Sequence, residues 1–177
     1  MATWTAPTLH STGDELAVTD WNAAMNNEIF LYEAPYCNYY NTVNSLFTQT
    51  PQQVSLGGTA ITAYGFTVSS NNIVVPIAGS YNVSYNVTAS VSVQCQLVAY
   101  LYQNGSQITN DIAAIPTAFL GTIPSTAGGS TVITCSANDT LGLWASTNGA
   151  AGSAGTTRAG AFGLNPSYLA VSFIGST

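Results

Sequence analysis

The feature that most constrains this chain is a stretch of 77 residues, from Ala34 to Asn110, that contains no Asp, Glu, Lys, Arg or His. The whole sequence of 177 residues has one Arg (Arg158), one His (His10) and no Lys. Most catalytic sites need titratable groups placed close together, and most nucleic-acid interfaces need Lys and Arg to neutralise phosphate. The sequence therefore indicates a protein that is no enzyme and has no nucleic-acid partner. It works instead by packing, assembling and binding.

The few titratable residues do not form a recognisable site. His10 lies in an N-terminal segment that is expected to be extended, far from any Ser or Asp of a β core. Beyond the first 33 residues the only acids are Asp111 and Asp139, too few to indicate a carboxylate pair or a calcium site. We expect no catalytic residue, no metal site and no cofactor.

The cysteines and the apolar residues limit the classes of protein to which the chain can belong. Cys37, Cys95 and Cys135 have no C-x-x-C spacing and are expected to be buried thiols, although a Cys95–Cys135 disulfide stays open. Apolar residues make up 46% of the chain, enough for a sizeable core. No stretch approaches the ~18 apolar residues of a membrane span, and no secretory signal is visible at the N-terminus. We expect synthesis in a reducing cytoplasm and no membrane partner.

The first 35 residues differ from the rest of the chain. Five of the seven acids fall in residues 1–33. Residues 1–18 have turn chemistry and are expected to be extended, and Trp4 and Leu9 are the candidate anchors to a partner surface.

A helix is expected over residues 19–33, with Thr19 as its cap and Pro35 as its end. Four residues at three- and four-residue steps form an apolar stripe on this helix: Trp21, Met25, Ile29 and Tyr32. A helix of this length is marginal alone, so the stripe must pack on the body of the protein or on another protein.

From about residue 44 the pattern changes to short β runs between turns, which is typical of an antiparallel sandwich or barrel. Tyr and Val alternate with Asn, Ser and Thr over residues 81–88, and Asn104-Gly105 is a strong signal for a type I′ hairpin. Residues 148–165, rich in Gly, Ala and Thr, are expected to form a long loop. The expected strands cover residues 44–48, 52–56, 60–67, 72–76, 79–90, 94–103, 106–110, 117–123, 130–136, 140–146 and 167–174.

Four pieces of this β-rich part, in the correct order, resemble the C1q/TNF-like jelly roll. They are NIVVPIAGSYNVS at 72–84, LVAYLYQNG at 97–105, VITCSANDTLGL at 132–143 and SYLAVSFIG at 167–175. The family usually has Gly before the Asp of the third piece, where this chain has Asn138. The resemblance implies a mainly β fold, an antiparallel jelly-roll sandwich. It also implies a homotrimer, with aromatic residues along its three-fold axis.

The N-terminus is similar to the opening segment of many tailed-phage virion proteins. That segment runs Trp-x-x-Pro, Gly-x-x-Leu, Asp-Trp-Asn, and here these are residues 4–7, 13–16 and 20–22. Such segments often precede β-rich domains displayed on the particle. The resemblance implies two domains: a virion-anchoring arm and helix at 1–35, and a jelly roll at 36–177.

Together the two resemblances imply a non-enzymatic structural protein on the surface of the virion. It would decorate or cement the capsid as a trimer, with the major capsid protein or another virion protein as partner. The alternative is a tail or fibre component whose jelly-roll tip binds a host receptor or glycan. In both cases the partner-binding residues would be Trp4, Leu9, Trp21, Met25, Ile29 and Tyr32.

Overall fold

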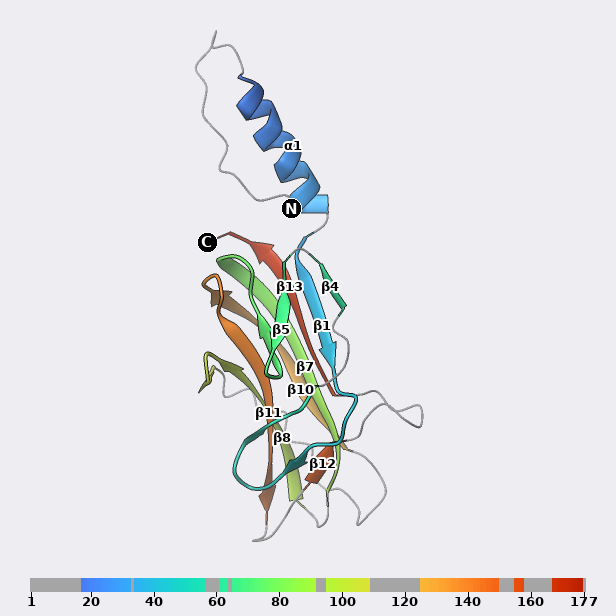
Figure 1. Cartoon of the computed structure of the whole chain (residues 1–177). Helices are drawn as coiled ribbons and strands as arrows, with labels where there is room; N and C mark the ends of the chain where they lie inside the picture. Colours follow the sequence, from blue (N-terminus) through green and yellow to red (C-terminus); the bar gives the residue numbers. More distant parts are fainter. Residues whose placement is uncertain are drawn as a thin grey trace.

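The computed structural model describes residues 17–32, 34–56, 61–63, 65–91, 95–108, 125–149, 155–157 and 167–176. Within these residues lie one helix and thirteen strands (Figure 1). The helix is α1 (Val18–Tyr32). The strands are β1 (Tyr36–Tyr40), β2 (Leu46–Phe47), β3 (Gln52–Gln53), β4 (Ile61–Ala63), β5 (Thr67–Ser69), β6 (Asn72–Val74), β7 (Gly79–Val91), β8 (Cys95–Gln103), β9 (Ser106–Gln107), β10 (Ser125–Cys135), β11 (Thr140–Gly149), β12 (Gly155–Thr157) and β13 (Tyr168–Gly175).

The expected helix is present, but its cap differs from the expectation. The helix begins at Val18, so Thr19 lies within its first turn and does not cap it. The Asp20 carboxylate instead accepts a hydrogen bond from the backbone N–H of Ala17 (3.0 Å), which satisfies a donor that the first turn leaves free. The helix stands beyond one end of the sandwich, close to where β1 begins and β13 ends (Figure 1).

The strands form two antiparallel sheets. The seven-stranded sheet has the order β2-β12-β7-β13-β1-β4. Strand β10 belongs to the same sheet and pairs with the edge of β7 opposite the one that β12 and β13 occupy. The six-stranded sheet has the order β5-β6-β11-β8-β9, and β3 also pairs with β11. Strands that are distant in the sequence, such as β1 and β13, are therefore neighbours, and the chain crosses between sheets as a jelly roll does.

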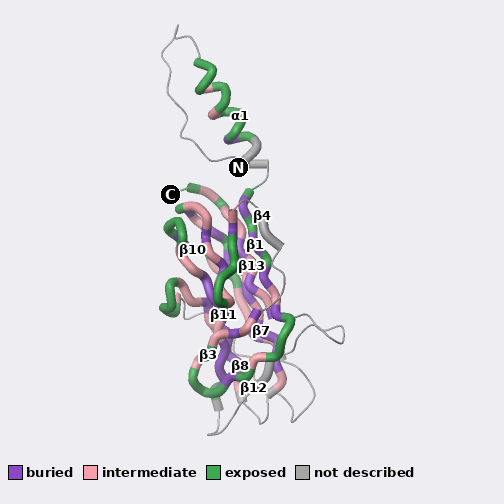
Figure 2. Tube along the Cα trace, viewed as in Figure 1, coloured by how far each residue is buried: buried purple, intermediate pink, exposed green. Residues whose placement is uncertain are grey.

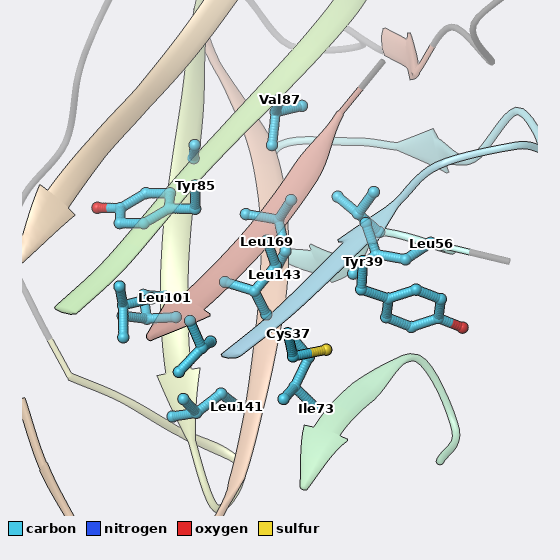
Figure 3. Close-up of a cluster of buried hydrophobic side chains, with 14 of the residues drawn as sticks. Cys37, Tyr39, Leu56, Ile73, Tyr85, Val87, Leu101, Leu141, Leu143 and Leu169 are labelled. Atoms are coloured by element: carbon cyan, nitrogen blue, oxygen red, sulfur yellow. The ribbon is translucent and has the colours of Figure 1, made fainter. Parts of the chain in front are cut away.

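The core lies between the two sheets, where each strand turns one face inward (Figures 2 and 3). On β7 the expected alternation is confirmed, because Tyr81, Val83, Tyr85 and Val87 are all buried. The opposite sheet contributes Leu97 and Leu101 from β8 and Leu141 and Leu143 from β11. Tyr81 packs edge-on against Phe66 and Phe173, with ring centroids 5.9 and 5.4 Å away, and its hydroxyl donates to the Ile77 carbonyl (2.8 Å).

Two turns confirm local expectations. Asn104 and Gly105 have φ angles of 51° and 77°, as a type I′ turn between β8 and β9 requires. Asn138, which stands where the jelly rolls that the sequence resembles usually have Gly, has φ of 71°. Asn tolerates this left-handed conformation better than most residues, so the departure leaves the turn intact.

Several expectations about the strands were wrong. Strand β1 was not expected, because its five residues are bounded by no clear turn on the C-terminal side; its partners, β13 and β4, lie far away in the sequence. The expected loop at 148–165 contains the end of β11 and all of β12, which pairs with β7 and β2 although its Gly-Thr-Thr sequence has no apolar alternation. The expected strand at 60–67 is interrupted at Gly65, where φ is 85°. The expected strand at 117–123 lies outside the described residues.

The disulfide that the sequence left open is absent. Cys37 and Cys135 are buried free thiols, so Cys135 forms no disulfide. Burial raises the pKa of the Cys37 thiol to about 12 and that of Cys135 to about 11. Thiols with such pKa values carry almost no thiolate at neutral pH, so both act as small apolar groups of the core.

Candidate assembly and docking surfaces

The outer face of the seven-stranded sheet is an extended surface without charge. Residues paired directly across antiparallel strands share a face, so the register identifies the residues that point away from the core. We call this set the assembly face: Tyr36, Asn38, Tyr40, Asn82, Ser84, Asn86, Gly128, Ser130, Val132, Tyr168, Ala170 and Ser172. It contains only small, amide, hydroxyl and aromatic groups, apart from Val132.

Hydrogen bonds hold the polar side chains of the assembly face in place. The Ser130 hydroxyl donates to Asn82 Oδ1 across β10 and β7 (3.1 Å), and the hydroxyls of Ser84 and Tyr168 lie 3.4 Å apart. Because the groups already satisfy one another, a second protein surface can cover them at a lower desolvation cost than free polar groups would impose.

Exposed apolar side chains gather at one end of the assembly face. One row of register partners joins Tyr36, Ser172, Asn82 and Val132. Tyr36 is 45% exposed, Val132 63%, and Ile174, near the end of β13, 55%. This is the end of the sandwich from which α1 extends (Figure 1).

Strand β10 adds to this face an edge with which no other described strand pairs, although the Gln103 amide of β8 donates to its Thr134 carbonyl (3.2 Å). Its 11 residues pair with β7 on one side, and no other described strand pairs with its far side. Its sequence, STAGGSTVITC, contains neither a charged residue nor a proline. Natural sheets usually protect a long edge with charges, proline, a bulge or a covering element. Among the described residues, the far edge of β10 therefore lacks most of these protections.

The helix exposes an apolar stripe to solvent. Trp21 is 61% exposed and Met25 is 52% exposed, so the structure does not place these two predicted residues against the sandwich. Val18, at 74% exposure, lies on the same stripe one position before the expected start of the helix, which is why the sequence missed it. Ile29 and Tyr32 belong to the same helix, but their side chains lie outside what the structure describes, as do Trp4 and Leu9 entirely.

Titratable groups are sparse in these surfaces. Among the described residues, no group of three or more His, Cys, Asp or Glu side chains is arranged to hold a metal ion. No helix in that part of the chain is long and apolar enough to cross a membrane. The groups that the described surfaces do present are apolar, aromatic, amide and hydroxyl side chains.

Comparison with solved structures shows the fold. The chain is similar to the TNF protein Eiger from S. frugiperda, with TM-score 0.56 and 13% identity over 82% of this chain and 95% of that one. It is also similar to murine APRIL at pH 5.0, with TM-score 0.55 and 9% identity over 80% of this chain and 100% of that one. The expected TNF-like jelly roll is thus confirmed. No family model matches the sequence, and no curated protein is similar to it.

Proposed function

We propose that this protein is a non-enzymatic structural protein of a tailed-phage virion, which forms a homotrimer and decorates or cements the capsid. Residues 1–35 form the docking unit, and residues 36–177 form the jelly roll that stands outward on the particle surface. The partner is the major capsid protein or another virion protein. The chain is made in the host cytoplasm and needs no cofactor.

The observation that carries this proposal is the exposed stripe of α1. A helix of 15 residues whose described apolar side chains, Val18, Trp21 and Met25, are largely exposed is marginal in water. Trp21 and Met25 nevertheless expose more than half of their surface. A helix that extends beyond its own domain and presents an aromatic residue gains stability once a partner covers that stripe.

The assembly face and the β10 edge support self-association. The face is uncharged, so two copies can approach without repulsion, and its tyrosines are residues that are enriched at interface cores. A second copy lying along β10 also protects the open edge of that strand. Light scattering on the purified protein checks the assembly: a trimer mass is expected, and a folded monomer at micromolar concentration would contradict it.

The docking unit is tested on particles that lack the protein. Full-length protein added to such particles should co-sediment with them, whereas a chain without residues 1–35 should stay in solution. Circular dichroism and a cooperative melt of the shortened chain serve as the folding control. If the shortened chain decorates particles at full occupancy, the arm and helix are not the anchor.

Salt separates packing from ion pairing in the attachment. Exposed ion pairs contribute about 0–1 kcal/mol and are screened over roughly 3 Å at 1 M salt. Occupancy on particles should therefore be largely retained at about 1 M NaCl. Near-complete release by salt alone would mean that the five acids of the arm dominate the attachment rather than the stripe.

The alternative is a tail or fibre component whose jelly-roll tip binds a host receptor or glycan. It keeps the same trimer and the same docking unit but places them elsewhere on the particle. The observation that favours a receptor- or glycan-binding role is a partly exposed aromatic cluster, which lies on the outer face of the six-stranded sheet. A low-resolution image of particles labelled on this protein distinguishes head from tail.

A further inference from the structure

The outer face of the six-stranded sheet carries a cluster of aromatic rings. Trp144 of β11 stacks on Tyr102 of β8, with ring centroids 4.6 Å apart and an interplanar angle of 21°. Tyr100 meets Tyr102 edge-on at 6.5 Å, and its hydroxyl lies 2.8 Å from the Ser146 hydroxyl. All three rings are only partly buried, so the cluster presents aromatic surface to solvent.

The amide side chains of Gln53 and Asn72 and the indole N–H of Trp144 converge on the space beside Gly142. Trp144 pairs with Gln53 of β3, and Gly142 pairs with Asn72 of β6. Gln53 Nε2 donates to Asn72 Oδ1 (2.8 Å), and Asn72 Nδ2 donates to the Ser70 carbonyl (3.2 Å). A Cβ atom at position 142 would collide with Asn72 Oδ1 and would lie 3.3 Å from Gln53 Nε2 and 3.4 Å from Trp144 Nε1. The missing side chain is therefore what lets these groups converge.

Several polar atoms of this cluster are available to a ligand. Within the described part of the chain, Trp144 Nε1, Gln53 Oε1 and the Tyr102 hydroxyl make no hydrogen bond to another protein group. They offer one donor, one acceptor and one group that can do either. The hydrogen bond from Gln53 to Asn72 fixes which end of the Gln53 amide remains free.

The chemistry of this face is neutral throughout. Its described residues along β3, β6, β8 and β11 include Gln53, Asn72, Gln96, Tyr100, Tyr102, Gly142, Trp144 and Asn148, together with the buried Val98 and Ser146, and none of them carries a charge. Among these described residues, an anionic ligand would find no cation and a cationic ligand would find no carboxylate. Apolar C–H surfaces suit the aromatic rings, and hydroxyl groups suit the amides and the indole N–H.

We infer that this face, centred on Trp144, Tyr102, Gln53 and Gly142, binds a neutral oligosaccharide. Pyranose rings combine an apolar C–H face with a rim of hydroxyls, which is the combination that stacked rings beside amides recognise. The site lies on the sheet opposite the assembly face, so a trimer formed through the seven-stranded sheet leaves it open (Figure 1). The inference is independent of the proposed docking on a virion.

The sequence alone did not indicate this site, because its members come from four separate strands. Gln53, Asn72, Tyr102 and Trp144 become neighbours only through the β3–β11, β6–β11 and β8–β11 pairings. The site also lies on a sheet face and not on loop tips, where a receptor-binding cluster was expected.

Calorimetric titration of the full-length protein with maltoheptaose, cellohexaose and chitohexaose tests the inference. At least one of the three is expected to bind saturably, with the same affinity at low salt and at 1 M NaCl. Polygalacturonate serves as an anionic comparison and is expected not to bind. Absence of saturable binding to all three neutral probes by the folded protein, or a preference for polygalacturonate, would overturn the inference.

Two variants locate the binding on this face. Trp144→Ala removes the stacked indole and is expected to lower the affinity at least about tenfold, as truncation of a central Trp anchor commonly does. Gly142→Ala adds one carbon among Asn72, Gln53 and Trp144 and is expected to weaken binding by a similar factor. Gly142→Ala still tests the site if Trp144→Ala fails to fold.

Val43→Ala is the control, because it truncates an exposed apolar side chain between β1 and β2, outside the six-stranded sheet, and should leave the affinity for the oligosaccharide unchanged. Circular dichroism shows that each variant is folded. If both Trp144→Ala and Gly142→Ala bind as the parent protein does, the ligand does not bind at this face.

Discussion

The helix and the sandwich use the same kinds of side chain in opposite ways. In the sandwich, Tyr81 and Tyr85 are buried to 1% exposure or less, whereas in α1 Trp21 is 61% exposed and Met25 52% exposed. Burial of large apolar groups is the main stabilising contribution to a fold, so the sandwich is stabilised by its own residues. Among the described side chains of the helix, the large apolar ones lack most of this contribution. We therefore expect the sandwich to fold by itself, and we propose that a partner covers the helix.

The largest expected effect is in the core of the sandwich. Tyr81→Ala should lower the free energy of unfolding by about 3–5 kcal/mol, because it leaves a cavity beside Phe66 and Phe173 and removes the hydrogen bond to Ile77. Urea unfolding measures the loss. Tyr81→Phe keeps the ring and should cost only about 1 kcal/mol. A loss below about 1 kcal/mol for Tyr81→Ala would mean that the core is not closely packed there.

The same type of truncation in the helix should hardly change the stability of the protein but should weaken its attachment to particles. Trp21→Ala should change the free energy of unfolding by less than about 0.5 kcal/mol, since the indole is largely exposed. Attachment to particles should instead weaken by about 2 kcal/mol or more, roughly thirtyfold, if Trp21 is an anchor of the interface. Co-sedimentation at graded protein concentrations measures the attachment. Asn22→Ala, an exposed position on the same helix, is the control and should bind normally.

Much of the sandwich could be predicted because its longest strands carry local signals. The alternation in β7, the Asn104-Gly105 turn and the closing strand β13 all lie where the sequence indicated them. Strands β1 and β12 could not be predicted, because their main evidence is a distant partner: β13 for β1 and β7 for β12. Local sequence carries no information about such a pairing.

One candidate surface could be predicted from local sequence, and the other two could not. The stripe at Trp21 and Met25 follows from helical spacing within a few residues, so the sequence could identify it. The assembly face and the aromatic cluster at Trp144 are built across strands, and only the register shows which residues share a face. Whether the stripe packs on its own chain or on a partner also could not be decided from spacing, since both require the same apolar pattern.

A smaller effect is expected where β10 lies against β7. A Cβ atom at Gly128 would collide with the Tyr85 carbonyl oxygen and lie 2.8 Å from Asn86 Cα, so Gly128→Ala should force the two strands apart. The expected loss of unfolding free energy is about 1–3 kcal/mol, measured by urea unfolding. Gly129→Ala is the matched control, because its Cβ would come no closer than 3.3 Å to the Tyr85 hydroxyl. Equal effects of the two variants would mean that β7 and β10 are not closely packed at Gly128, and that the sandwich differs less from the exposed helix than we infer.

The smallest expected effect concerns charge, in which the two regions also differ. Most acids belong to the N-terminal segment, but Asp139 lies in the turn between β10 and β11 and is held by the sandwich. Its carboxylate accepts hydrogen bonds from Asn104 Nδ2 (2.8 Å), Gln103 Nε2 (2.7 Å) and the Ser136 N–H (2.8 Å). The bond from Asn104, with smaller contributions from Ser136 and Gln103, holds the pKa of Asp139 below its usual 3.8.

A lowered pKa fixes the sign of the pH dependence. Between the folded pKa and about 3.8 the unfolded chain binds more protons than the folded one, so this contribution to stability is complete above about pH 5 and is lost as the pH falls through the folded pKa. Because the turn is partly exposed, the contribution should stay below about 1 kcal/mol. Asp139→Asn should therefore be slightly less stable at pH 7 and should lose less stability than the parent between pH 5 and pH 3, as measured by thermal melts. Parallel pH profiles for the two proteins would show that Asp139 does not clamp the β8–β9 and β10–β11 turns together, and that the sandwich holds this end by packing alone.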